Sequence, residues 1–147
     1  MTHVDIPKLL KNAKTIAVFG LSAKPHRASY EVASYLQQNG YRILPINPNE
    51  AGNLILSEFC YGSLPEAAKA SGLAIDIVVC FRKSADIPEI LEQAIVVNAA
   101  CLWMQLDICN EACANRAEHE GMLVVMDKCL KIEHARCQAS AAHIPHI

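Results

Sequence analysis

The chain has 147 residues, of which 52% are hydrophobic and 19% are charged. At about 100–200 residues per domain, this length predicts one domain over residues 1–147, and the composition excludes intrinsic disorder. Lys and Arg number 13 against 15 Asp and Glu, a net charge of −2 that gives no electrostatic footprint for nucleic acid. Because we find neither a secretory signal nor a membrane-spanning apolar stretch, we expect a cytoplasmic protein without a membrane partner.

Apolar, β-branched runs alternate with helical patterns along the whole chain. In chain order, the first half predicts a helix over Asp5–Asn12, a strand over Thr15–Gly20, a helix over Ser29–Asn39 ended by Gly40, and a strand over Tyr41–Ile46. An edge strand around Phe59–Cys60 and a helix over Pro65–Ala70 follow. The turn at Asn47-Pro48-Asn49 ends the second long strand, because Pro cannot donate to a ladder.

The second half continues the alternation with strands over Ile75–Phe81, Ala99–Gln105 and Met122–Met126. The intervening helices are capped by Asp86 with Glu89 and by Asn110, and a last helix covers Cys129–Arg136. Residues 138–147 show no periodicity and are expected to form a flexible tail. The alternation predicts an α/β fold with a doubly wound, mainly parallel sheet of five to six strands and helices on both faces.

Seven cysteines without an export signal predict free thiols rather than a disulfide framework. Cys80 and Cys101 lie in apolar strands, where we expect them in the core together with Trp103. Cys129, His134 and Cys137 lack the paired spacing of a zinc site, so we predict no metal. No nucleophile elbow or other catalytic constellation is present, which favours a binding protein over an enzyme.

The loop after the first strand, residues 20–29, has the features of a phosphate site. It combines a glycine turn at Gly20, the hydroxyls of Ser22 and Ser29, and the cations Lys24 and Arg27, just before a helix N-terminus. Free amides, the positive helix end and bidentate Arg all favour an anion. In a doubly wound sheet this loop lies at the carboxyl ends of the strands, where ligands bind.

The same region disfavours ordinary NAD binding. Only one of the three glycines of the dinucleotide fingerprint is present, and no acidic residue follows the second long strand to bind an unphosphorylated ribose. A phosphorylated ribose fits better, with His26 and Arg42 as further candidate cations. Coenzyme A (CoA) and NADP both carry such a phosphate, and spacing alone leaves both open.

Six segments occur in the order of one known family: 20–30 (GLSAKPHRASY), 46–49 (INPN), 76–82 (DIVVCFR), 103–105 (WMQ), 110–111 (NE) and 124–134 (VVMDKCLKIEH). They lie within a match over residues 5–136 and resemble the stand-alone CoA-binding protein family, which is similar to the N-terminal CoA-binding domain of the succinyl-CoA synthetase α subunit. The resemblance implies a Rossmann-like sheet with phosphates at the 20–29 loop, adenosine near Asn47 and Pro48, and Phe81-Arg82-Lys83 along the nucleotide and pantetheine path. The implied CoA-binding residues are Gly20, Ser22, Lys24, Pro25, Arg27, Ser29, Asn47, Pro48, Phe81 and Arg82.

Asp107 departs from the family, whose members commonly have glycine there, so we assign no site role to the loop over Gln105–Asn110. Cys129, after Asp127-Lys128, is a candidate for disulfide exchange with CoA or another thiol. The synthetase's phosphorylated His lies in a ligase portion without a counterpart in this sequence, so we expect no acyl-CoA ligation by the chain alone.

The sequence thus predicts a module that binds CoA or acyl-CoA and senses, carries or presents it, as a homo-oligomer or with a partner enzyme. Three alternatives stay open: an NADP-dependent oxidoreductase, a subunit of a split acyl-CoA synthetase, and a homo-oligomeric interaction protein whose nucleotide site has decayed.

Overall fold

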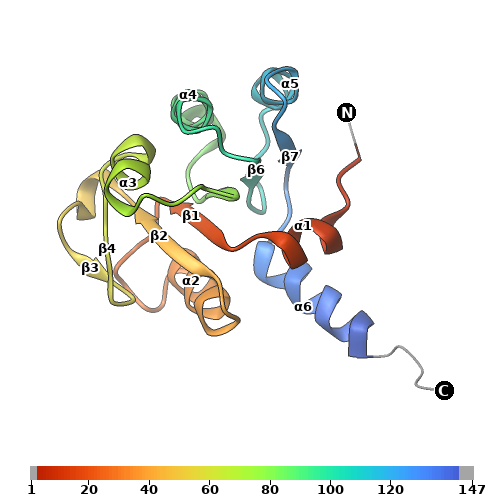
Figure 1. Ribbon diagram of the computed structural model, residues 1–147, viewed down its shortest axis with the longest axis horizontal. Coiled ribbons are helices and arrows are strands. Elements are labelled where there is room, and N and C mark those ends of the chain that lie inside the picture. The colour runs from red at the N-terminus through yellow and green to blue at the C-terminus, as the bar shows by residue number, and fades with distance from the viewer. Residues whose placement is uncertain (1–2, 143–147) are drawn as a thin grey trace.

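The computed structural model describes residues 3–142 and contains one five-stranded parallel sheet with helices on both faces (Figure 1). The sheet order is β2-β1-β5-β6-β7, formed by β1 (Thr15–Phe19), β2 (Arg42–Ile46), β5 (Ile77–Cys80), β6 (Cys101–Met104) and β7 (Leu123–Val125). All four neighbouring pairs are parallel. The predicted α/β, Rossmann-like, doubly wound sheet is therefore confirmed, and its strand order reverses between β1 and β5.

The helices form two layers that bury opposite faces of the sheet. One layer contains α1 (Ile6–Asn12), α2 (Ala28–Gln38) and α6 (Leu130–Ala142), and the other contains α3 (Leu64–Ser71), α4 (Ile87–Val96) and α5 (Glu111–His119). Successive residues of a strand point to opposite faces, so Ile16 and Val18 pack in the first layer and Ala17 and Phe19 in the second. Burial on both faces explains why the strands read as continuous apolar runs.

Several predicted helix signals act as expected, and one does not. Asn110 accepts a hydrogen bond from the Cys113 N–H at 3.1 Å and caps α5, and Gly40, with φ +94°, follows the end of α2. The predicted cap at Asp86 is wrong: Asp86 ends the short 3₁₀ helix η2 (Ser84–Asp86) in a helical conformation, and its side chain makes no cap hydrogen bond. A cap residue needs an extended backbone, which the 3₁₀ turn prevents.

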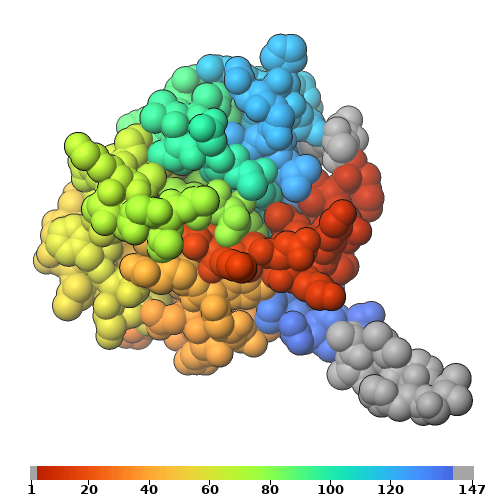
Figure 2. Space-filling model, in the orientation of Figure 1, coloured from red at the N-terminus to blue at the C-terminus, as the bar shows by residue number. Residues whose placement is uncertain are grey.

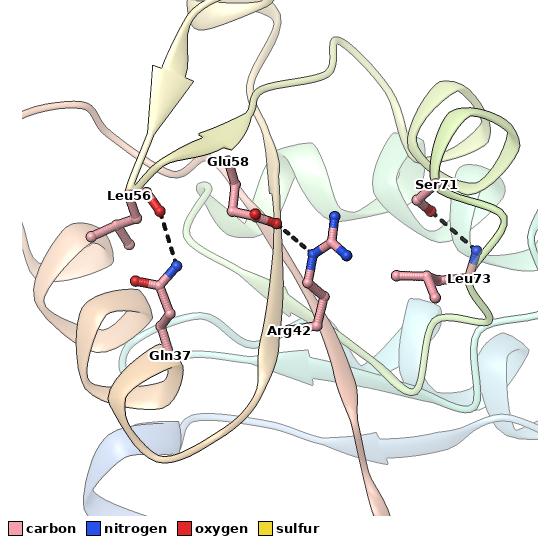
Figure 3. A network of polar contacts seen from close by, with 6 residues as sticks. All are labelled: Gln37, Arg42, Leu56, Glu58, Ser71 and Leu73. Carbon is pink, nitrogen blue, oxygen red and sulfur yellow. Dashed lines mark hydrogen bonds and ion pairs between the residues drawn. The ribbon is translucent and has the colours of Figure 1, made fainter.

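The predicted edge strand around Phe59–Cys60 reaches the main sheet only at an isolated parallel bridge between Tyr61 and Ile46, where the Tyr61 N–H donates to the Pro45 carbonyl at 3.0 Å. The chain instead forms a separate two-stranded antiparallel hairpin of β3 (Leu54–Ile55) and β4 (Glu58–Phe59). Leu56 and Ser57 both have positive φ, which produces a tight two-residue turn between the strands. Figure 3 shows how the hairpin is fastened, with the Gln37 side chain donating to the Leu56 carbonyl and Arg42 ion-paired to Glu58.

Helix α6 continues beyond its predicted end at Arg136 and reaches Ala142. Part of the predicted tail, residues 138–142, is therefore helical, as their Gln- and Ala-rich composition permits. Residues 143–147 lie outside the described residues. No helix within residues 3–142 is long and apolar enough to cross a membrane.

Candidate functional site

The loops after β1 and β5 meet at the carboxyl edge of the sheet, where the strand order reverses. Gly20 has a φ of +88°, and a Cβ atom placed there would lie only 2.7 Å from the Phe81 carbonyl oxygen. The Gly20 N–H also donates to the Ile46 carbonyl at 2.7 Å. Glycine is therefore required at this position for two reasons: the backbone has a positive φ, and the β5 loop approaches too closely for a side chain.

The loop over residues 20–27 is held in shape by its own serines. Ser29 is buried, and its Oγ accepts a hydrogen bond from the Ser22 N–H at 3.0 Å. Ser22 Oγ in turn accepts from the Lys24 N–H at 3.1 Å. Both serines hold the loop in shape, and each hydroxyl retains its hydrogen for donation.

The cations of this loop are exposed and form no ion pair within residues 3–142. Lys24, Pro25 and Arg27 are exposed, and the ion pairs of the described residues involve none of Lys24, Arg27 and Arg82. Helix α2 begins directly after Arg27, which makes no side-chain cap hydrogen bond. The unneutralised cations and the positive end of an eleven-residue helix suit an anion.

Asn47 joins the β2 loop to the β1 loop. Its Nδ2 donates to the Leu21 carbonyl at 2.9 Å, and its Oδ1 accepts from the Asn49 N–H at 3.0 Å. The side chain is buried, whereas the following Pro48 is exposed at the start of η1 (Pro48–Glu50). Asn47 thus fixes the relative position of two loops, and Pro48 offers an open surface beside them.

An open cleft of about 490 Å³ lies beside the loop over residues 20–29, the predicted phosphate loop. It is lined by the start of α2, the ends of β5 and β6 and the residue before α6: Ala28, Val32, Phe81, Arg82, Lys83, Asp86, Gln105, Leu106, Ile108 and Cys129. This volume is within the usual range for a small-molecule site. Of the predicted residues, Phe81 and Arg82 line the cleft, and Gly20 packs against both of them.

Sequence reasoning missed the contribution of the β6 loop. Gln105, Leu106 and Ile108 all line the cleft, although no site role was assigned to this loop. The available signal was position, because these residues follow a strand end as the 81–83 segment does. Asp107 is exposed, is not a lining residue, and adopts a φ of +67° while its N–H donates to Asp127.

Arg42 was predicted as a further phosphate-binding cation, and this prediction is wrong. It begins β2, so it lies at the amino edge of the sheet, opposite Asn47. Its guanidinium is paired with Glu58 of the hairpin (Figure 3).

The buried cysteines and Trp103 belong to the core, as predicted. Burial raises the pKa of Cys101 to about 12 and raises the pKa of Cys80 further. Trp103 is fully buried, and its indole N–H donates to the Lys128 carbonyl at 2.8 Å. His134 Nδ1 lies 2.8 Å from the Tyr35 hydroxyl, and nowhere in residues 3–142 do three metal-binding side chains converge.

A second cavity, of about 370 Å³, lies at the opposite edge of the sheet. It is lined partly by α1 residues, together with Asp76, whose carboxylate already accepts the backbone N–H groups of Lys14 and Thr15. The face toward the viewer in Figure 2 carries α1 in red beside the green segment that precedes β5. At this edge α1 and Asp76 line the cavity, whereas Lys24 and Arg27 follow the carboxyl edge.

The molecule is an α/β domain with an open cleft at the carboxyl edge of its sheet. Residues 14–135 match the family described as CoA binding domain, and the chain belongs to this family. It is 34% identical over 134 residues to the uncharacterized protein YneT of Bacillus subtilis (strain 168), covering 91% of this chain and 95% of that protein.

Solved structures agree with this assignment. Cell-free ID.343 from Thermus thermophilus has 31% identity and a TM-score of 0.84, with 93% of this chain and 99% of that chain covered. A hypothetical protein from Pyrococcus horikoshii OT3 has 32% identity and a TM-score of 0.83, with 94% and 93% covered.

Proposed function

We propose that the protein binds CoA or acyl-CoA at the carboxyl edge of its sheet and holds it for sensing, carriage or presentation to a partner enzyme. Membership of the CoA-binding domain family supports this proposal. The observation that carries it is the junction at Gly20, where a loop with unpaired cations meets the open cleft. Such a junction suits a ligand with an anionic head and a long uncharged arm.

In this binding mode each predicted residue has a role that its position allows. Lys24 and Arg27 neutralise phosphates beside the α2 N-terminus, and Gly20, Ser22, Pro25 and Ser29 shape the loop. Asn47 and Pro48 flank the adenosine, while Phe81 and Arg82 guide the pantetheine arm. The roles are binding and positioning, without a catalytic residue.

The class of ligand is tested by thermal unfolding with CoA, acetyl-CoA, NAD and NADP. A ligand present at one hundred times its dissociation constant adds about 2.7 kcal/mol of stability, which shifts the melting temperature clearly. We expect CoA and acetyl-CoA to stabilise the protein and NAD to have no effect. Selective stabilisation by NADP would overturn the proposal in favour of an oxidoreductase, and no response to any of the four would indicate a decayed site.

The double variant Lys24→Ala with Arg27→Ala tests the phosphate loop. We expect it to weaken CoA binding by about 2–4 kcal/mol, because each cation makes a charge-assisted hydrogen bond to phosphate. The measurement is isothermal titration calorimetry. The control is Lys11→Ala with Lys69→Ala, which removes the same charge from exposed positions on α1 and α3. Equal affinity in the two double variants would refute the assignment.

A further inference from the structure

A second group of polar side chains lies at the end of the cleft away from the phosphate loop. Gln105 directly follows β6, Cys129 directly precedes α6, and both line the cleft. Neighbouring strands are about 4.8 Å apart, and β6 is two strands from β1, so their ends are separated by roughly 10 Å. With adenosine beside β2 and phosphates beside β1, Gln105 and Cys129 face the end of the ligand that carries the sulfur.

The Gln105 amide has one partnered atom and one unpartnered atom. Its Oε1 accepts a hydrogen bond from the Leu130 N–H at 2.8 Å, and this donor fixes which way the amide points. Its Nε2 has no hydrogen-bond partner within residues 3–142, although the residue is only 5% exposed. Because no fully buried side-chain nitrogen or oxygen of the described residues lacks a partner, Nε2 must open to the cleft. A donor so placed is available to an acceptor atom of a bound ligand.

The backbone at Cys129 is held next to this amide. The preceding residue, Lys128, accepts the indole hydrogen bond of Trp103, and the following residue, Leu130, donates to Gln105. Cys129 is a half-buried free thiol whose carbonyl accepts the Glu133 N–H at 2.9 Å, which places it at the N-cap of α6. The Gln105 side chain is therefore held by Leu130, and the backbone on both sides of Cys129 is held at the end of β6.

The residues that follow Gln105 give this end of the cleft an apolar lining. Val32, Phe81, Leu106 and Ile108 line the cleft, whereas its charged lining residues all belong to the segment over 82–86 after β5. Leu106 is 52% exposed and forms an open apolar rim. An uncharged group of small size fits this end better than an anionic one.

We propose that the inner end of the cleft, where the Gln105 Nε2 lacks a partner within residues 3–142 and lies beside Cys129, binds the thioester of a short, uncharged acyl-CoA. Gln105 Nε2 donates to the thioester carbonyl oxygen, and the acyl group contacts the apolar rim. The proposal rests on the proposed function and makes acyl-CoA, rather than free CoA, the preferred ligand. A free thiol is a weak acceptor and leaves the amide without a partner, whereas a thioester places a carbonyl next to the sulfur.

The test compares acetyl-CoA with S-ethyl-CoA, a thioether of nearly the same size that lacks the carbonyl oxygen. We expect the unaltered protein to bind acetyl-CoA about tenfold more tightly, the value of one additional hydrogen bond. In Gln105→Glu this preference should disappear, because the carboxylate still accepts from Leu130 but no longer donates. Calorimetry at alkaline pH keeps the carboxylate ionised, and the nearby α6 N-terminus favours that form.

Two controls separate this inference from folding and from the proposed function. Gln93→Glu is the matched variant, because Gln93 Oε1 accepts the Leu64 N–H of α3 at 2.9 Å in the same way but Gln93 does not line the cleft. It should leave both affinities unchanged. Adenosine 3′,5′-diphosphate, which lacks the arm, should bind equally to the unaltered protein and to Gln105→Glu.

Each remaining outcome decides the question. Equal binding of acetyl-CoA and S-ethyl-CoA by the unaltered protein overturns the inference without any variant. A loss of both ligands to the same degree in Gln105→Glu also overturns it, because Gln105 then contacts the pantetheine and not the thioester. If neither CoA nor its thioester binds the unaltered protein, the proposed function and the inference fail together.

Discussion

Gly20 is the residue on which the assembly of the site most depends. A Cβ atom at this position would lie 2.7 Å from the Phe81 carbonyl oxygen. Any residue that replaces Gly20 must also adopt its φ of +88°. We expect Gly20→Ala to lower the free energy of unfolding by about 2–4 kcal/mol, the sum of a left-handed backbone and a forced shift of the β5 loop. Urea unfolding measures this change, and CoA affinity should fall as well.

A second glycine, Gly52, separates the energetic cost of the close contact at Gly20 from the cost of its backbone conformation. Gly52 has a φ of +94°, but no atom lies within 4 Å of a Cβ placed there. Gly52→Ala should therefore cost only about 1–2 kcal/mol, the penalty of the left-handed conformation. If the two variants lose the same stability, the contact between Gly20 and Phe81 has no energetic consequence.

At the scale of the element, α6 is docked on α2 by a buried histidine. His134 is 4% exposed, lies 2.8 Å from the Tyr35 hydroxyl through Nδ1, and packs edge-on against the rings of Tyr35 and Tyr41. Gln138 lies on its other side, with its Nε2 3.5 Å from His134 Nε2. This burial lowers the pKa of His134 below its ordinary value of 6.5.

The lowered pKa predicts a specific loss of stability in acid. At pH values between the folded and unfolded pKa of His134, the unfolded chain binds more protons than the folded chain. The contribution of His134 to the free energy of unfolding is therefore complete above pH 6.5 and declines as the pH falls below this value. The decline is at most about 1.4 kcal/mol per pH unit for one group. Urea unfolding across this pH range should show a shallower dependence for His134→Gln than for the unaltered protein.

The exposed His119 on α5 provides the control for this pH dependence. His119→Gln should leave the slope of stability against pH unchanged. If His134→Gln and His119→Gln give the same slope, the decline must come from other groups.

Elements whose ends are set by nearby residues could be predicted from the sequence. Elements that depend on contacts with distant parts of the chain could not. Asn110 caps α5 through an oxygen three residues from its partner, which is visible in the sequence. The β3–β4 hairpin depends instead on positive φ at Leu56 and Ser57, two residue types that do not favour it. The cap predicted at Asp86 failed because the preceding 3₁₀ turn had no signal of its own.

For the whole molecule, the class of the sheet could be predicted but the full composition of the cleft could not. Gly20 was predicted because it ends a recognisable strand, whereas Phe81 and Arg82 were predicted from the resemblance to the CoA-binding family. Gln105 and Cys129 are brought together through hydrogen bonds over a separation of about 25 residues, involving Trp103 with Lys128 and Gln105 with Leu130. Ser29 and Asn47 were predicted as ligand contacts, and their observed hydrogen bonds connect loops within the protein.

The reactivity of the seven cysteine thiols measures the folded state of the whole molecule, because the thiols range from exposed to buried. Cys109 is exposed, Cys129 and Cys137 are half-buried, and Cys60, Cys80, Cys101 and Cys113 are buried. We expect iodoacetamide to modify Cys109 first and the four buried thiols only on unfolding, since the thiolate is the reactive form and burial raises their pKa. Peptide mass spectrometry after timed quenching gives the order.

Acetyl-CoA should slow modification of Cys129 alone, with Cys109, which does not line the cleft, as the internal control. Equal protection of both thiols, or of neither, would place the ligand elsewhere on the protein.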